Sequence, residues 1–271
     1  MKTFQNKVIW ITGASSGIGE ALAYALSSKK SKLILSSRNQ QELERVKRGC
    51  ENGGDSVFIL PLDLTRTYEL EEKTQEAWRH FGKVDCCILN AGIAVRDLAV
   101  STLPETGRQV METNYFGPIT IAKSILPFML EKQNGHLVVV SSLSGKYGVP
   151  RLSAYAASKH ALHGYFDSLR AEIATRNIKI SMIIPGFIRT AIAEHAIDGN
   201  GNAYGKRIEV NEKGMSAEMC AENILDAVAK EKQEAYVGGA EMLSVYLNRF
   251  FPKFFSRVIR NHPMRSLRLG K

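Results

Sequence analysis

The sequence lacks any long apolar run, and this excludes several classes of protein. None of its hydrophobic segments approaches the roughly 20 uninterrupted apolar residues that cross a bilayer. Residues 1–7 contain no apolar stretch typical of a signal peptide or a membrane anchor. We therefore expect a cytoplasmic protein whose only contact with membranes is peripheral.

Cysteine is scarce, and its spacing matches no metal site. The 271 residues include four cysteines, Cys50, Cys86, Cys87 and Cys220. We expect no disulfide framework, and such thiols suit a reducing compartment. The nearby pair His160 and His163 does not by itself make a metal site, so we predict no bound metal.

Acidic residues are missing from the C-terminal end of the chain. The protein has 36 Lys and Arg against 27 Asp and Glu, a net charge of +9. Seven of these basic residues and no acidic residue lie in residues 242–271, which leaves 29 basic against 27 acidic residues before them. Because residues 1–241 are nearly neutral, the charge does not indicate a nucleic-acid-binding protein.

Short apolar runs alternate with helical patterns along the chain. They predict strands at 8–11, 32–36, 56–60, 84–89, 136–140, 178–184 and 234–237, and helices near 19–28, 40–51, 105–130, 155–175 and 217–230. The fully apolar run at 137–140 suits a strand that is covered on both faces. The pattern predicts one doubly wound α/β Rossmann domain over 1–241, with a mainly parallel sheet of about seven strands and helices on both faces.

The turn after the first predicted strand is rich in glycine. It contains Gly13, Ser15, Ser16, Gly17, Ile18 and Gly19, and it leads directly into a helical pattern. Glycines at such positions permit a tight turn and let backbone amides approach a pyrophosphate at the N-terminus of a helix. We therefore predict a dinucleotide site, against the alternative of a turn that binds no ligand.

The end of the second predicted strand indicates which dinucleotide binds. About 20 residues after the glycine motif, proteins that bind NAD place an acid on the ribose 2′-hydroxyl. This sequence has Ser37 and Arg38 there instead. A guanidinium suits a 2′-phosphate, so we predict NADP(H) rather than NAD(H), unless Arg38 is only a solvated surface residue.

Three residues have a pattern that suits proton transfer. Tyr155 and Lys159 are four apart on a predicted helix, so they share one face. A nearby ammonium and a nicotinamide ring are expected to lower the tyrosine pKa from about 10, so that Tyr155 exchanges a proton with a carbonyl or alcohol oxygen. Ser142, at the end of a predicted strand, would hydrogen-bond the same oxygen. The alternative is a non-catalytic NADP-binding or scaffold protein at a membrane surface.

These motifs follow one another along the chain in the order typical of the short-chain dehydrogenase/reductase family. The chain therefore resembles this family from about residue 7 to residue 237, nearest its hydroxysteroid-dehydrogenase and "member 7" groups. The resemblance implies that Asn114 positions a water on the proton path and that Lys159 holds the nicotinamide ribose. It also implies cofactor contacts by Asp63 and Leu64 at the adenine, by Asn90, Ala91 and Gly92 near the adenosine ribose, and by Pro185, Gly186, Ile188 and Thr190 on the nicotinamide side. A homodimer or homotetramer is implied, with the helices 105–130 and 155–175 at the interface.

The family resemblance also indicates a substrate region. Residues 191–214 contain several glycines and no clear period, and they correspond to the family's mobile substrate-binding lid. The residues expected to face it are mostly apolar: Ala94, Val95, Leu143, Ser144, Tyr147, Val149 and Leu152. We therefore expect a hydrophobic carbonyl or alcohol substrate, such as a steroid, retinoid or fatty-acyl derivative.

Residues 242–271 form a basic amphipathic tail. At about 100° per residue, Arg249, Lys253, Arg257 and Arg260 fall within an arc of about 80°, and aromatic residues occupy the opposite side. Pro252 predicts two short helices, the second starting near Phe251. A basic face opposite an aromatic face is typical of helices that lie in a membrane interface. The tail is the one candidate for membrane contact, because the N-terminal anchor of the related proteins is not expected here. The alternative is packing of the aromatics on the body or a second subunit.

Overall fold

Seven parallel strands form the central sheet of the protein. The computed structural model describes residues 3–51, 53–190, 196–205 and 214–261. Within these residues the strand order is β3-β2-β1-β4-β5-β6-β9. The strands are β1 (Val8–Thr12), β2 (Lys32–Ser36), β3 (Val57–Ile59), β4 (Cys86–Leu89), β5 (Gly135–Val140), β6 (Ile178–Pro185) and β9 (Glu234–Val237). A small separate pair joins β7 (Ile188–Arg189) to β8 (Met215–Ser216).

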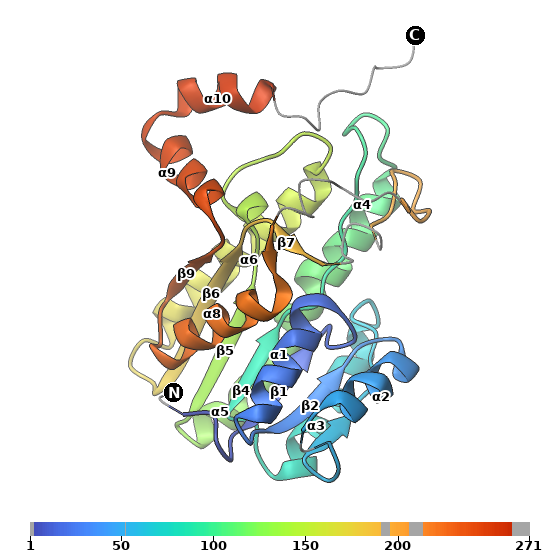
Figure 1. The fold of residues 1–271 in the computed structure, drawn as a ribbon, viewed down its shortest axis with the longest axis vertical. Helices are drawn as coiled ribbons and strands as arrows, with labels where there is room; N and C mark the ends of the chain where they lie inside the picture. The colour runs from blue at the N-terminus through green and yellow to red at the C-terminus, as the bar shows by residue number, and fades with distance from the viewer. Residues whose placement is uncertain (1–2, 52, 191–195, 206–213, 262–271) are drawn as a thin grey trace.

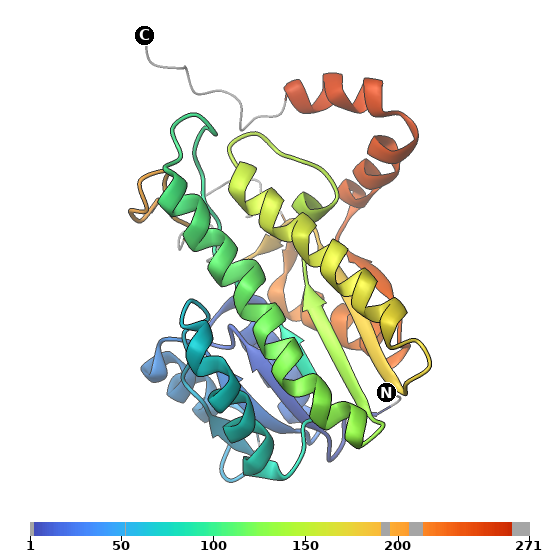
Figure 2. The same ribbon diagram turned by 180° about the vertical axis from the view of Figure 1, so that it is seen from behind.

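Helices cover both faces of this sheet. One face carries α1 (Gly17–Ser28), α2 (Gln40–Gly49) and α8 (Ala217–Ala229), which lie in front in Figure 1. The other face, seen in Figure 2, carries α3 (Leu70–Phe81), α5 (Gly117–Glu131) and α6 (Ser153–Glu172). This arrangement confirms the predicted doubly wound α/β class.

The side chains of each strand alternate between the two helix layers. Ile9 and Ile11 of β1 pack with α1 and α8, whereas Val8 and Trp10 pack with α3, α5 and α6. The adjacent Cys86 and Cys87 divide in the same way. Since both faces are buried, every position of β1 is apolar except Thr12 at its end.

The register places the carboxyl ends of the strands along one edge. Ile11 pairs with Ile88, and Val140 pairs with Ile183. The chain moves outward from β1 to β2 on one side and to β4 on the other, so the topological switch point lies beyond the ends of β1 and β4. In open α/β sheets ligands bind at this position.

Two features of the helices differ from the sequence-based prediction. The helix α3 was not among the predicted helices, because most of its residues are polar or charged, although Leu70, Ala77, Trp78 and Phe81 pack against the core. The predicted helix 105–130 is divided into α4 (Pro104–Met111), a π-helical turn η2 (Glu112–Phe116) and α5. Single π-turns within α-helices are frequent at functional sites.

The described part of the tail forms two short helices, as expected. Helix α9 (Leu243–Phe250) is followed by α10 (Pro252–Arg260), and the break coincides with Pro252. Both extend beyond the carboxyl edge of the sheet (Figure 1). No helix within the described ranges combines the length and the apolar character of a membrane span.

Asp85 joins the amino ends of three neighbouring strands. Its Oδ2 accepts a hydrogen bond from the backbone N–H of Val8 at 2.9 Å, and its carbonyl accepts one from His136 at 3.1 Å. Its side chain is almost fully buried and pairs with Lys83 at 2.8 Å. The carboxylate therefore satisfies a buried donor that the strand ladder leaves over.

We expect Asp85→Ala to lower the free energy of unfolding by about 1–3 kcal/mol, because the buried Val8 N–H loses its acceptor. Asp85→Asn keeps an acceptor oxygen, so its free energy of unfolding should fall clearly less than that of Asp85→Ala. Urea unfolding of both variants measures the difference. Equal stability of the alanine variant and the wild type would contradict this role.

Candidate active site

The glycine-rich turn lies closely against the end of β4. Gly13 has a φ of +68°, and a Cβ atom there would stand 2.7 Å from the Cα of Ala91. A Cβ at Gly19 would stand 2.1 Å from the Gly13 carbonyl oxygen. The turn therefore requires glycine at both positions, and it leaves the N-terminus of α1 open to a ligand.

Thr12 and Asn90 hold this turn to the sheet. The Asn90 amide Nδ2 donates to the carbonyl oxygens of Thr12 and Gly13, each at 3.2 Å. The backbone N–H groups of Asn90 and Ala91 donate to the Thr12 hydroxyl at 3.1 and 3.2 Å. The predicted residues of the turn and of β4 are thus brought together.

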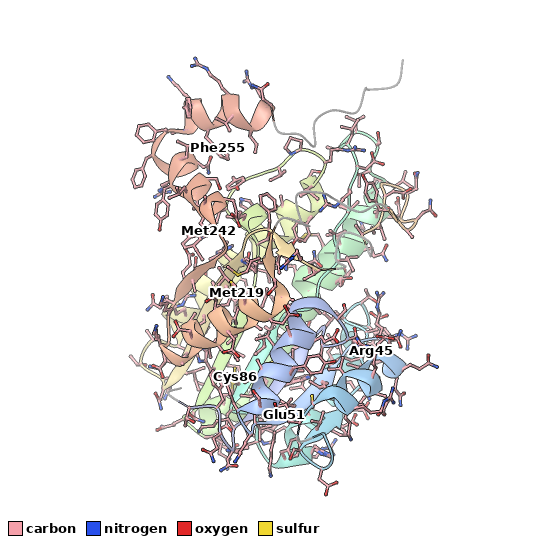
Figure 3. The ribbon with its side chains drawn as sticks, viewed as in Figure 1. Arg45, Glu51, Cys86, Met219, Met242 and Phe255 are labelled. Atoms are coloured by element: carbon pink, nitrogen blue, oxygen red, sulfur yellow. The ribbon has the colours of Figure 1, made fainter. Side chains whose placement is uncertain are left out.

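Arg45 braces the same turn from helix α2. Its Nη2 donates to the Ser15 carbonyl at 3.2 Å, and its guanidinium pairs with Glu20 at 2.6 Å (Arg45 is labelled in Figure 3). Sequence reasoning missed this contact, because Arg45 follows the turn by 30 residues and reads as an ordinary surface position of an amphipathic helix.

The ends of β2 and β3 continue the same edge. The Ser37 carbonyl accepts a hydrogen bond from Leu62 at 3.1 Å, and Ser37 Oγ donates to the Asn39 carbonyl at 3.4 Å. Arg38 is exposed beside them. Asp63 Oδ1 accepts from the backbone N–H of Thr65 at 3.0 Å, and Leu64 is buried.

The loop after β6 is held mainly by the C-terminal segments. Gly186 donates to the Val237 carbonyl at 2.9 Å, Phe187 donates to Glu241, and Ile188 pairs with Met215. Thr190 reaches the glycine-rich turn, since a Cβ at Gly17 would lie 3.1 Å from its Cγ2. Pro185 is buried at the end of β6.

Asn114 lies fully buried in the π-helical turn. Its Oδ1 accepts from the Ile93 N–H at 2.8 Å, and its Nδ2 donates to the Ile93 carbonyl at 2.9 Å and to Ser158 Oγ at 3.0 Å. Both amide hydrogens are therefore used within the protein. Asn114 therefore connects the loop after β4 to helix α6, and its role in positioning a water on a proton path stays a prediction.

Ser142 and Tyr155 meet at the end of β5. Ser142 Oγ accepts from the Ser144 N–H at 3.1 Å, so its own hydroxyl hydrogen remains available. The Ser142 hydroxyl is close enough to Tyr155 to act on the pKa of that phenol. Burial raises the pKa of Tyr155 above its ordinary value, although the Ser142 hydroxyl and the charge of Arg96 act to lower it.

Lys159 lies beneath the Tyr155 ring. Its Nζ stands 5.8 Å from the ring centroid and donates to the Val140 carbonyl at 2.9 Å. Burial lowers the pKa of Lys159 to about 8. The expected lowering of the Tyr155 pKa by this ammonium is not seen: burial is the larger effect, and the Nζ is held at the Val140 carbonyl below the ring rather than at the hydroxyl.

Gly92 brings the last of these groups together. A Cβ at this position would lie 3.2 Å from Asn114 Oδ1 and 3.5 Å from Lys159 Nζ. The four residues predicted to act in proton transfer, Asn114, Ser142, Tyr155 and Lys159, therefore form one cluster at the carboxyl edge of the sheet.

Arg96 adds a positive charge that sequence reasoning missed. Its residue is 9% exposed, and its guanidinium is close enough to Tyr155 to affect the pKa of that phenol. Its backbone N–H donates to the Ile197 carbonyl at 2.9 Å. The sequence feature that pointed to Arg96 is its position: it is a charged residue directly after the apolar pair Ala94 and Val95, and only four residues beyond Gly92.

Three of the histidines lie within hydrogen-bond distance of protein oxygens, and two of them, His160 and His163, are on the helix that carries Tyr155. His136 Nε2 lies 2.9 Å from Ser181 Oγ, His160 Nδ1 lies 2.8 Å from the Ala156 carbonyl, and His163 Nε2 lies 3.0 Å from Ser141 Oγ. In the part of the chain that the structure describes, no group of three or more His, Cys, Asp or Glu residues is arranged to hold a metal ion.

Comparison with known structures supports the fold. A short chain dehydrogenase/reductase from Burkholderia phymatum, solved in complex with NAD, has a TM-score of 0.84 at 23% identity, covering 94% of this chain and 96% of its own. Levodione reductase has a TM-score of 0.79 at 23% identity, covering 89% and 99%. At 23% identity these comparisons establish the fold alone.

Comparison of sequences identifies the family. The short chain dehydrogenase model matches residues 7–200. "Dehydrogenase/reductase SDR family protein 7-like" from Drosophila melanogaster is 39% identical, covering 92% of this chain and 78% of its own. "Dehydrogenase/reductase SDR family member 7" from Homo sapiens is 39% identical, covering 90% and 74%. The chain therefore belongs to the short-chain dehydrogenase/reductase family of oxidoreductases, which bind a nicotinamide cofactor, near its member 7 group.

Proposed function

We propose that this protein interconverts a carbonyl group and a secondary alcohol at Tyr155. The observation that supports this most directly is that the Ser142 hydroxyl and the buried Lys159 ammonium both lie next to Tyr155, with Lys159 Nζ 5.8 Å from the centroid of the phenol ring. An oxygen placed between the two hydroxyl groups would meet two donors at once. This is the arrangement that stabilises the negative charge developing on a carbonyl oxygen.

The residues divide the work as follows in the direction of reduction. A nicotinamide supplies the hydride when it is bound. Tyr155 gives its hydroxyl proton to the substrate oxygen, and Ser142 donates a hydrogen bond to that oxygen. Arg96 favours the phenolate that remains, since its charge lowers the pKa of Tyr155. Lys159 is mostly protonated at neutral pH, because its pKa is about 8. One ammonium hydrogen is donated to the Val140 carbonyl, and the others remain available to the nicotinamide ribose.

We expect Tyr155→Phe to lower turnover at least about 100-fold, because the proton donor is lost while the ring remains. Tyr165→Phe, on the same helix, is the matched control and should retain activity. The measurement is NADPH oxidation with a panel of hydrophobic ketones and aldehydes, alongside NADPH binding by fluorescence.

Two outcomes would contradict this assignment. If Tyr155→Phe turned a substrate over at the wild-type rate, the proton donor would lie elsewhere. If the wild type bound NADPH and reduced no carbonyl in the panel, the alternative of a non-catalytic NADP-binding or scaffold protein would be favoured.

For the cofactor we propose NADP(H) rather than NAD(H). Arg38 is exposed at the end of β2 and forms no ion pair with any described residue, so its guanidinium is open to a phosphate. Ser37 beside it holds a hydroxyl, and no acid occupies this strand end to repel a 2′-phosphate. The NAD in the Burkholderia phymatum structure belongs to that protein, whose identity to this chain is 23%.

We expect Arg38→Ala to weaken NADPH binding about 10- to 100-fold and to leave NADH binding unchanged, because charge-assisted hydrogen bonds to the 2′-phosphate are lost. Arg48→Ala, which removes another exposed arginine of the same region, is the control. Fluorescence titration of each variant with both reduced cofactors gives the affinities. An equal loss for both cofactors would contradict the role of Arg38.

The substrate that we propose is hydrophobic, such as a steroid, retinoid or fatty-acyl carbonyl compound. Ala94, Val95, Leu143 and Leu152 are buried near the cluster, and Val95 forms a bridge with Ile197 of the proposed lid. The lid, residues 191–214, is described only at 196–205 and 214. Arg96 in the same region means that the wall around the carbonyl is not purely apolar.

We also propose a homodimer or homotetramer through the helices predicted at 105–130 and 155–175, which correspond to α4, η2, α5 and α6. Within this face, α4, η2 and α6 surround a shallow, mostly apolar hollow that includes Pro104, Met111, Phe116, Ala154 and Ala157. Phe116 remains exposed at its rim. An exposed aromatic beside a hollow of small side chains suits the matching face of a second subunit.

The tail is proposed to contact an anionic membrane surface from the cytoplasm. Phe250 is 69% exposed, and Phe251 and Phe254 are also exposed. By contrast Phe255 is 5% exposed and packs on Tyr147, with ring centroids 4.8 Å apart, so it anchors the tail to the body. Figure 3 shows Phe255 at the outer end of the molecule, where other side chains of α9 and α10 project outward. Aromatic rings beside exposed Lys253 and Arg257 match an interface of anionic headgroups.

We expect the triple variant Phe250→Ser, Phe251→Ser, Phe254→Ser to bind vesicles containing phosphatidylserine at least about tenfold more weakly than the wild type. These side chains are exposed, so the fold should persist. The control replaces the exposed Tyr68 and Val100 of the body by serine. Co-sedimentation at low and high salt is the measurement. The proposal would be removed if the wild type and the triple variant pelleted equally, or if neither pelleted.

A further inference from the structure

A buried serine and histidine and a partly exposed carboxylate lie next to the proposed catalytic cluster. Ser141 follows β5, His163 lies on α6, and Glu234 begins β9. His163 Nε2 is 3.0 Å from Ser141 Oγ, and His163 Nδ1 is 4.0 Å from Glu234 Oε2. Nothing in the proposed reaction uses these three groups.

The charges around His163 indicate how its ring is protonated. Burial and the nearby Lys146 lower the pKa of His163 to about 4, so the ring is neutral near pH 7 and carries one N–H. Glu234 faces Nδ1, and a carboxylate favours an N–H over a lone pair on that side. Nε2 is then the acceptor for the Ser141 hydroxyl, which also lies 3.4 Å from the Lys159 carbonyl.

The order of these residues resembles the serine, histidine and carboxylate of hydrolases, but its surroundings do not suit a nucleophile. Ser141 is 3% exposed, so no substrate carbonyl can approach its oxygen. The backbone N–H of Ser141 donates to the Ile183 carbonyl at 2.8 Å, which continues the pairing of β5 with β6. The contact between Ser141 and His163 therefore acts within the protein.

This contact joins the two elements that carry the proposed catalytic side chains. Ser141 precedes Ser142 in the chain, and His163 is one helical turn after Lys159 and two turns after Tyr155. The loop η3 (Leu143–Gly145) lies directly on it, because a Cβ at Gly145 would stand 2.5 Å from Ser141 Oγ and 3.0 Å from His163 Nε2. A shift of this bond would move Ser142 relative to Tyr155.

Glu234 is itself held in place from the other side. Its carboxylate pairs with Lys146, which follows η3, and accepts a hydrogen bond from Tyr236 of the same strand. The Lys146 carbonyl in turn accepts from Asn248 Nδ2 of α9 at 3.4 Å. The loop that carries Ser142 is therefore fixed both to α6 and to β9.

We propose that His163 is a positioning residue for the reaction: its hydrogen bond to Ser141, oriented by Glu234, sets the distance between the hydroxyl groups of Ser142 and Tyr155. This inference rests on the proposed function of the Tyr155 cluster. It assigns a role to a histidine that contacts neither substrate nor cofactor, and that acts through the backbone between Ser141 and Ser142.

The first test compares three variants of helix α6. We expect His163→Leu to lower kcat about tenfold with the KM for NADPH unchanged, because a displacement of well under 1 Å is enough to impair proton transfer. His163→Gln can accept the Ser141 hydrogen bond and should restore kcat to within about threefold of wild type. His160→Leu, which removes an exposed histidine of the same helix, should have no effect. Rates are measured well below each variant's unfolding temperature.

The second test needs no substrate, so it separates failure of this inference from failure of the proposed function. Tyrosines labelled at Cζ report phenolate formation by NMR in the NADP⁺ complex, and Tyr155→Phe identifies the signal. We expect the midpoint for Tyr155 to rise by about half a pH unit or more in His163→Leu, because the Ser142 hydrogen bond that favours the phenolate is weakened. The double variant Ser141→Ala, His163→Leu should shift no further than the larger single shift.

The inference is overturned if His163→Leu leaves the Tyr155 midpoint unchanged, whether or not a substrate is turned over. It is also overturned if His163→Gln loses as much activity as His163→Leu. A wild type that turns over no carbonyl, together with a shifted midpoint, would leave the positioning role standing and remove the reaction.

Discussion

The parallel pairing of seven strands is the constraint on which the rest of this protein depends. Parallel register sends every strand end to one edge, where the chain must turn into a helix or loop. Polar residues that are far apart in the sequence, such as Thr12, Asn90 and Ser142, thereby meet in one region. The apolar interior of the sheet on both faces provides the rigid base for that edge.

The buried charges at this edge are unusual for a protein interior, and their surroundings account for them. Lys159 donates to the Val140 carbonyl, and Arg96 lies beside the phenol of Tyr155. Desolvation lowers the pKa of both cations, so each holds its proton less firmly than in water. Anionic groups that approach them, such as a phenolate or an alkoxide, meet positive charge in a medium that screens it weakly.

The sequence was sufficient for the fold class, six of the seven main strand positions to within about a residue, and the residues gathered at the site. Such features depend on local patterns: apolar runs, a glycine-rich turn, and Tyr155 one turn from Lys159. It was insufficient for Arg45, Arg96 and His163, since their contacts join segments far apart in the chain. The helix α3 was missed because most of its residues are polar or charged, and the π-turn at Asn114 leaves no periodic signal. The catalytic roles of the gathered residues stay predictions.

The alternation of side chains along β4 has a consequence for the chemistry that the protein tolerates. Cys86 and Cys87 are neighbours in the chain, yet they lie in different helix layers, so their sulfur atoms are separated by the sheet itself. Burial raises the pKa of both thiols, and the thiolate is the form that oxidants attack. A buried thiol with a raised pKa holds little thiolate, so peroxide and disulfide exchange should reach these two sulfur atoms slowly.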